Sequence, residues 1–157
     1  MTADLDIRPS NVTEPPVIAL LTAHFENMRA ISPPDACFVL DLDGLRAPDV
    51  QMLAAWRGKD LAAIGALKHH GDGLFEIKSM RSDDRFRRNG AGSAILAALI
   101  DLAKTQGAAH LALETGTTDH FAPSRGLYAR FGFAPCGPFA DYAAHPHSLF
   151  MDRPARM

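Results

Sequence analysis

Apolar side chains recur along the chain at two spacings, which separate expected helices from expected strands. Between the proline pairs at 15–16 and 33–34 they recur every three or four residues, the period of one helix face. The residues with this spacing are Ile18, Leu21, Phe25 and Met28. Proline is tolerated in a first helical turn and disfavours helix in the residue before it. One amphipathic helix is therefore predicted here, after a short opening strand at 7–9.

The next third of the chain has the pattern of strands separated by tight turns. Apolar runs at 51–56, 61–67 and 74–80 are separated by turn residues at 58–60 and 69–73, which predicts an antiparallel meander. Successive strand side chains point to opposite faces. In the third run this places Phe75, Ile77 and Ser79 on one face and Glu76, Lys78 and Met80 on the other.

The clearest helix follows a polar, arginine-rich loop and ends before Gly107. Its apolar positions are Ile95, Leu96, Leu99, Leu102 and Ala103. A strand at 110–115 then suggests a parallel crossover within an otherwise antiparallel sheet. The remaining predicted elements are a short helix at 40–46, a helix at 123–131 and a strand at 148–151. With no repeat or linker, residues 1–157 are expected to form a single domain.

Composition narrows the class of protein. The 157 residues are 47% apolar and 22% charged, with a formal net charge of -2, which is typical of a globular protein and argues against nucleic-acid binding through bulk charge. Cys37 and Cys136 are too far apart in sequence to suggest a disulfide framework or zinc site. The N-terminus lacks the pattern of a signal peptide, and no apolar run approaches membrane-spanning length. The expected location is the cytoplasm, with no membrane partner.

The loop from Arg85 to Ser93 has the composition of a phosphate-binding site. A helix start presents unpaired N–H groups and a partial positive charge, Gly90 and Gly92 permit close approach, and Arg87 and Arg88 add charge. Alone, these glycines could equally belong to an ordinary basic loop. The triphosphate-binding P-loop is excluded because it needs a Gly-Lys followed by Ser or Thr, and the dinucleotide motif because it needs glycine at position 95.

Two motifs together resemble the GNAT superfamily of N-acetyltransferases. Arg87-x-x-Gly90-x-Gly92 resembles the acetyl-CoA signature of that family, and the segment 127–133, Leu-Tyr-Ala-Arg-Phe-Gly-Phe, resembles its Leu-Tyr-x-x-x-Gly-Phe motif. The opening strand is also similar. The resemblance implies an α/β fold of the α+β type, with a mostly antiparallel, V-splayed mixed sheet flanked by helices.

The resemblance also implies where acetyl-CoA, as co-substrate, lies. It is expected in the split between the strand ending near Met80 and the strand ending near Thr115, with its pantetheine along the backbone of residues 79–81. The expected cofactor-binding residues are Ser79, Met80, Arg81, Arg87, Arg88, Asn89, Gly90, Ala91, Gly92, Ser93 and Ser124. Phe121 stands where many relatives carry an asparagine, and Ser124 is the candidate to replace that polar contact.

Acetyl transfer needs an acid for the thiolate, an oxyanion donor and a base for the amine. Tyr128 matches the family's general acid, and a backbone N–H near Met80 or Arg81 is the expected oxyanion donor. Glu76 and Glu114 are both candidates for the base. Either could instead recognise substrate or be salt-bridged, Glu76 to Lys78 in particular.

Several other polar residues have weaker claims to a function. His120 could serve as a base, Cys136 as an acyl carrier, and Asp141 could pair with an ammonium group in a loop over the acceptor side. Arg125 and Arg130 could meet the 3'-phosphate of the cofactor, although a solvated face is the plainer expectation. His69 and His70, expected in a turn, lack a third ligand, so no metal site is expected.

The sequence therefore predicts an acetyltransferase acting on a primary amine of a small molecule or amino acid, by direct attack in a ternary complex. Two alternatives stay open: a non-catalytic acyl-CoA-binding or sensing domain, and an acetyltransferase of protein lysines or N-termini. Exposed apolar residues near the C-terminus could also form a homodimer contact.

Overall fold

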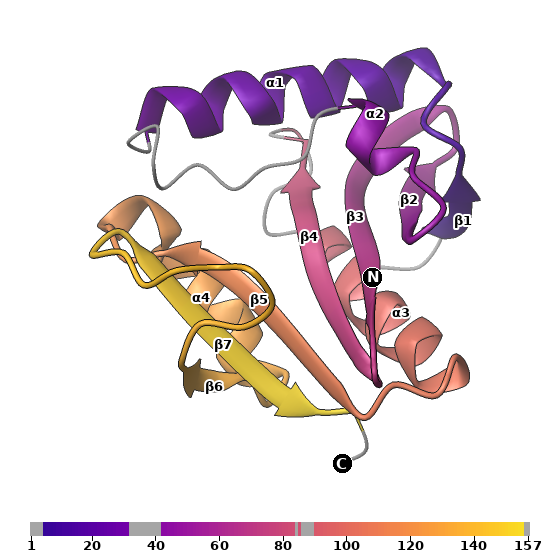
Figure 1. Ribbon diagram of the computed structural model, residues 1–157. Helices are drawn as coiled ribbons and strands as arrows, with labels where there is room; N and C mark the ends of the chain where they lie inside the picture. The colour runs from indigo at the N-terminus through magenta and orange to yellow at the C-terminus, as the bar shows by residue number, and fades with distance from the viewer. Residues whose placement is uncertain (1–4, 32–41, 84, 86–89, 156–157) are drawn as a thin grey trace.

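The computed structural model describes residues 5–31, 42–83, 85 and 90–155, which form a seven-stranded sheet with helices on both faces (Figure 1). The strand order is β1-β2-β3-β4-β5-β7-β6. The strands are β1 (Asp6–Ser10), β2 (Val50–Arg57), β3 (Asp60–Gly71), β4 (Leu74–Ser82), β5 (His110–Gly116), β6 (Ala134–Cys136) and β7 (Ser148–Pro154). The helices are α1 (Pro15–Ile31), α2 (Leu42–Leu45), α3 (Ala91–Thr105) and α4 (Ala122–Arg130), with a 3-10 turn η3 (Asp119–Phe121).

Every neighbouring pair of strands is antiparallel except β4 and β5, which are parallel. This confirms the predicted meander and the predicted parallel crossover through α3. Parallel strands need such a crossover, because a tight hairpin can join only antiparallel neighbours.

The sheet is covered by two separate apolar layers. On one face, α1 and α2 pack through Val17, Leu21 and Leu45 against side chains of β2 and β3. On the other, α3 packs through Ile95, Leu96 and Leu99, and α4 joins the same layer through Tyr128. Burial of these two layers fixes the helices against the sheet, because removing apolar surface from water is the main favourable term in folding.

Most predicted elements are confirmed within a few residues. The short helix predicted at 40–46 is α2, with residues 40 and 41 outside the described part of the chain. The strand β6 was missed, because three residues that include a proline carry no period-2 pattern. It exists through pairing with β7, where Ala134 faces Asp152 and Cys136 faces Phe150.

The predicted turn at 69–73 is too long, and its two histidines lie in a strand. β3 continues to Gly71, with His69 opposite Phe75 and Lys68 opposite Glu76. The reversal is made by residues 71–73 alone, all of which have positive φ angles of 53° to 91°. The two glycines adopt this conformation without steric cost, so the chain turns in fewer residues than its polar run suggested.

Candidate active site

The parallel strands β4 and β5 stay paired for only four residue pairs and then diverge. Pairing runs from Leu74 opposite His110 to Ile77 opposite Leu113. Figure 1 shows the two strands close together at one end and apart at the other, with α1 lying across the open end. Two adjoining hollows lie along this divergence, and His24, Met28 and Met80 line both. The predicted V-shaped split is therefore present.

A β-bulge interrupts β4 at the point where the strands diverge. Ala66 pairs with Lys78 and Ile64 with Arg81, so Gly65 faces two residues of β4. Ser79 has a φ of 54°, which is unusual for a residue with a side chain. The bulge corrects the predicted alternation: Met80 packs with the α3 layer and not on the face of Glu76 and Lys78.

The bulge also re-aims the backbone of residues 79–81. In the described part of the chain the ladder between β4 and β5 ends at Ile77, so these residues have no strand partner on that side. Ser79 and Met80 line the inner hollow, and Met80 and Arg81 line the outer one. Their backbone groups are placed where an extended ligand could pair with them.

The start of α3 lies at the other side of the outer hollow. Gly90 is the N-cap, with a φ of 85° and no side chain to cap the helix. Gly90, Gly92 and Ser93 line this hollow, whose volume is about 440 Å³. The first-turn N–H groups and the helix dipole at this end favour an anion. A Cβ at Gly92 would lie 3.4 Å from the Ser82 hydroxyl oxygen, so a larger side chain would project into the hollow.

The described residues of the outer hollow therefore fit an acyl-CoA: unpaired strand edge, glycine-lined helix start and an open cleft between them. Ser124 lines both hollows, as a replacement for the missing asparagine requires. Ala91 is different, because its side chain is buried in the apolar layer below α3. Arg87, Arg88 and Asn89 lie outside the described residues.

Tyr128 lies at the closed end of the cleft, on α4. It lines the inner hollow with Glu76 and Glu114, and its ring packs edge-on to Phe133 at 6.0 Å. Burial, and next the charge of Glu114, raise the pKa of the Tyr128 phenol. The phenol therefore keeps its proton throughout the neutral range.

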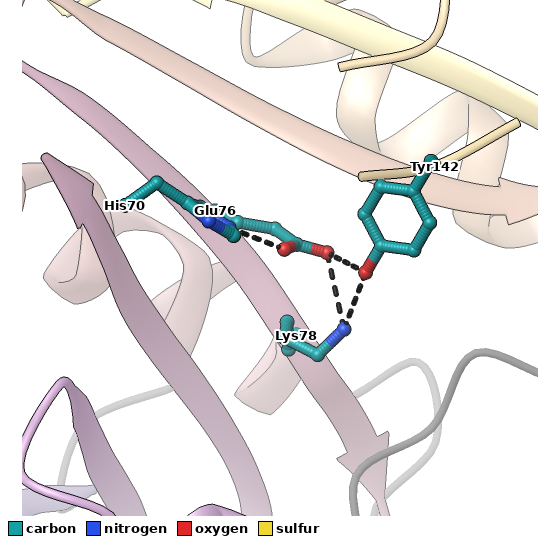
Figure 2. Close-up of polar contacts among 4 residues, drawn as sticks. All are labelled: His70, Glu76, Lys78 and Tyr142. Atoms are coloured by element: carbon teal, nitrogen blue, oxygen red, sulfur yellow. Dashed lines mark hydrogen bonds and ion pairs between the residues drawn. The ribbon is translucent and has the colours of Figure 1, made fainter. Parts of the chain in front are cut away.

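Glu76 is fully buried and is surrounded by three donors (Figure 2). Nε2 of His70 lies 2.8 Å from its Oε1, while Nζ of Lys78 at 3.1 Å and the hydroxyl of Tyr142 at 2.6 Å contact its Oε2. Lys78 Nζ also donates to the Tyr142 oxygen at 2.7 Å. The expected Glu76–Lys78 pair is confirmed, and a buried carboxylate needs such partners to offset the loss of hydration.

Glu114 is in a different state from Glu76. It lies on β5 facing the same inner hollow and is only partly buried. Burial raises its pKa to about 7, opposed by the nearby Ser148 hydroxyl and the charge of Lys78, and supported by the charge of Glu76. Such a carboxyl changes charge near neutral pH, as a general base requires.

The remaining sequence candidates lie in varied places. His120 lines the outer hollow on the same side as Ser124, and so does Arg130. Arg125 instead donates to the carbonyls of Gly116 and Thr118, at 2.7 and 2.8 Å. It therefore fixes the end of β5 and does not lie on a solvated face, as the sequence suggested. The ring of Phe121 packs over Gly116 so closely that a Cβ there would overlap it.

The loop after β6 reaches Glu76, but through a different residue from the one expected to face the acceptor. Asp141 is exposed, and its neighbour Tyr142 points inward to Glu76. Cys136 lines a separate hollow with Asp72 and Asp152, and burial raises the pKa of its thiol, which makes an acyl carrier less suitable. Among the described residues, no three metal-ligating side chains come together.

Sequence reasoning missed His24, His70 and Tyr142. His70 was placed in a turn, and period-2 counting of β3 through Lys68 would have put it on the face of Glu76. Tyr142 lies in a loop of irregular structure and His24 on the helix face between Leu21 and Met28, so neither had a motif to mark it. The position of each is set by tertiary packing.

Comparison with known proteins agrees with this geometry. Residues 16–133 match the model of the acetyltransferase (GNAT) family. The chain is 39% identical over 149 residues to the uncharacterized N-acetyltransferase YsnE of Bacillus subtilis, covering 95% of this chain and 99% of that one. It is 41% identical over 145 residues to the uncharacterized N-acetyltransferase YedL of Escherichia coli, covering 92% and 91%. An IAA acetyltransferase of Azospirillum brasilense is 35% identical over 123 residues, or 78% of this chain and 79% of that one.

Solved structures show the same fold. A Klebsiella pneumoniae protein assigned to the acyl-CoA N-acyltransferases superposes with a TM-score of 0.77 at 26% identity, covering 99% of both chains. An aminoglycoside 6'-N-acetyltransferase complexed with coenzyme A gives 0.71 at 12% identity, covering 96% of this chain and 97% of that one.

The splayed mixed sheet, the glycine-lined helix start and the family match define a GNAT acyl-CoA N-acyltransferase fold. The chain belongs to the GNAT family and is an acetyl-CoA-dependent N-acetyltransferase. The alternative of a non-catalytic binding domain is thereby set aside. In the described part of the chain, no helix is both long and apolar enough to cross a membrane.

Proposed function

We propose that the enzyme acetylates a primary amine of a small molecule or amino acid, by direct attack within a ternary complex. The observation that carries the proposal is that Tyr128 and Glu114 line the same hollow at the divergence of β4 and β5. An acid and a base whose pKa values are pushed apart by their surroundings are what a direct transfer requires.

Glu114 is the proposed general base. Its pKa near 7 lets it accept the amine proton at neutral pH, whereas both oxygens of Glu76 already accept hydrogen bonds. We assign Glu76 to holding Lys78 and Tyr142 in place on the acceptor side. This narrows the two candidates that the sequence leaves open.

Tyr128 is the proposed general acid. Acetyl-CoA supplies the acetyl group activated as a thioester. As the amine nitrogen bonds to the acetyl carbon and the carbon–sulfur bond breaks, Glu114 takes a proton from nitrogen and Tyr128 gives one to sulfur. Backbone N–H groups at the bulge, near Met80 and Arg81, would stabilise the carbonyl oxygen.

A small acceptor is favoured over a protein by the loop after β6. Phe139 and Tyr142 pack on one another at 5.1 Å and on Phe150 at 5.8 and 5.7 Å, so a cluster of aromatic rings adjoins Glu76, which lines the inner hollow. A polypeptide acceptor would need an open groove at this place.

The test is an acceptor screen with purified protein and acetyl-CoA. The panel contains amino acids, polyamines, aromatic amines, IAA because one relative is an IAA acetyltransferase, and peptides with free N-termini or lysines. Thiol release and mass spectrometry of the product report transfer. We expect an N-acetylated small amine, with the rate reduced by at least about tenfold in Tyr128→Phe. Acetylation of peptides alone, or an unchanged rate in Tyr128→Phe, contradicts the proposal.

A further inference from the structure

Two residues that line the cleft each have a buried polar side-chain atom without a hydrogen-bond partner in the described part of the chain. These atoms are Nδ1 of His24, on α1, and Nε of Arg81, just beyond the bulge in β4. His24 is only 8% exposed and lines both hollows, and Arg81 lines the outer one. Buried polar groups are nearly always paired, so two orphans on one cleft point to a ligand that pairs with them.

Among the described residues Arg81 forms no ion pair, although its charge, after the contacts with Arg85, also lowers the pKa of Asp83. In the described structure its guanidinium makes one hydrogen bond, from Nη1 to the side-chain oxygen of Asn27, at 3.5 Å. The carboxylate of Asp83, two residues on, instead accepts from the backbone N–H and Nε of Arg85, at 2.9 and 3.1 Å. Lys78, the cation of the inner hollow, is paired with Glu76. A partly buried guanidinium left in this way suits a planar anion.

We propose that His24 and Arg81 form a subsite for a carboxylate carried by the acceptor, which would make the substrate an amino acid or a related amine with an acidic group. This rests on the proposed function and extends it by naming the class of acceptor.

The arrangement of the cleft separates this subsite from the cofactor. The outer hollow has one wall from α3 and α4, with Gly92, Leu127 and Arg130, and an opposite wall from α1, with His24 and Asn27. The helix start that suits phosphate is on the first wall. The guanidinium of Arg81 contacts the second wall, because it donates to Asn27 on α1. His24 continues from there into the inner hollow, so one small molecule could reach both Arg81 and Glu114.

The protonation state of His24 is consistent with this role. Burial, and next the charge of Arg81, lower its pKa to about 4, so the imidazole is neutral at physiological pH and can donate one N–H to a carboxylate. A bound anion would stabilise the protonated ring and raise that pKa. The His24 titration is thus a readout of anion binding that does not depend on catalysis.

The first test compares the best amino acid from the screen with its carboxamide, in wild type and in Arg81→Gln and Arg81→Lys. The carboxamide keeps the amine and loses the negative charge. The ratio of KM in the variant to KM in wild type is taken for each substrate separately, so the different basicity of the two amines cancels. We expect Arg81→Gln to raise KM for the amino acid about tenfold or more and to change KM for the carboxamide less than about twofold, with partial recovery in Arg81→Lys. Equal effects on both substrates would overturn the subsite.

The second test separates the acceptor from the other anion in the complex, the cofactor. The cofactor is expected to contact residue 81 through its backbone and not its side chain, so calorimetry with CoA should give the same affinity for wild type and Arg81→Gln. A loss of CoA affinity would assign Arg81 to the cofactor phosphates and overturn the proposal.

NMR titration of His24 with and without the same amino acid should show a raised pKa with the ligand, and an unchanged pKa would also contradict the proposal. Failure of every amine in the screen refutes the proposed function, while acetylation of neutral amines alone refutes only this subsite.

Discussion

At the residue scale, the proposed chemistry depends on how far burial raises the pKa of Glu114. Its pKa of about 7 predicts that kcat/KM rises with pH as this carboxyl loses its proton, with a midpoint near that value. Tyr128 stays protonated over the same range because its own pKa is raised. The measurement is a pH profile of kcat/KM for wild type and Glu114→Gln. The substitution should lower the rate and remove the rise of kcat/KM near pH 7. A rise that persists in Glu114→Gln would belong to the titration of another group.

The same residue should affect stability in the opposite direction to His24. Glu114 has a raised pKa, so the folded state binds the extra proton between about pH 4.5 and 7, and stability falls as pH rises through this window. His24 has a lowered pKa, so the unfolded state binds the extra proton between about pH 4 and 6.5, and stability rises with pH there. The two slopes oppose each other below about pH 6.5.

Because the pH dependences of stability from Glu114 and His24 oppose each other, a variant is needed to see either one separately. We expect Glu114→Gln to become more stable relative to wild type as pH rises from about 5 to 8, by on the order of 1 to 2 kcal/mol after allowance for partial exposure. Urea unfolding at a series of pH values measures the difference. A constant difference across the range would show that the carboxyl is not perturbed in the folded state.

Tyr142 offers a test of the buried polar cluster. Tyr142→Phe keeps the ring contacts with Phe139 and Phe150 and removes only the hydroxyl that contacts Glu76 and Lys78. The loss should destabilise the protein by about 1 to 2 kcal/mol, because a buried carboxylate loses a donor. Denaturant unfolding measures it, and a double-mutant cycle with Glu76→Gln should show that the two effects are not additive. Additive losses would mean that the hydroxyl acts independently of Glu76.

At the element scale, sequence predicts what local patterns determine and misses what strand pairing determines. Helices α1 and α3 follow from apolar spacing with proline and glycine boundaries, and the glycines at the start of α3 belong to a recognisable motif. The face on which Met80 lies does not follow from the sequence, because it depends on the bulge that forms against Gly65. For the same reason Glu76 and Glu114 could be named but not ranked: their different partners come from β3 and from the loop after β6.

The start of α3 gives a prediction at this scale. Gly92→Glu should abolish binding of acetyl-CoA, because a carboxylate placed in the first turn would occupy the phosphate position and repel it. Gly92 is a better site than Gly90, whose φ of 85° would strain any side chain and confuse binding with folding. Thr105→Glu adds the same charge at the exposed far end of the helix and is the matched control. Calorimetry should find binding only in wild type and the control, and retained affinity in Gly92→Glu would refute the phosphate site.

At the scale of the whole molecule, the cofactor should act as a brace between two parts of the sheet. Only four residue pairs join β4 to β5, and beyond them the strands are apart, with β1 to β4 on one side and β5 to β7 on the other. A ligand that contacts the edge of β4, the start of α3 and the face of α4 bridges this division.

Because CoA binds the folded chain alone, it stabilises that state by RT ln(1 + [L]/Kd), about 2.7 kcal/mol at a hundredfold excess over Kd. For a chain of this size this corresponds to a rise in Tm of roughly 5 to 10 °C, measurable by differential scanning calorimetry with increasing CoA. Gly92→Glu should show no rise and Thr105→Glu a full one. A rise of equal size in Gly92→Glu would place the stabilising contact elsewhere than at the start of α3.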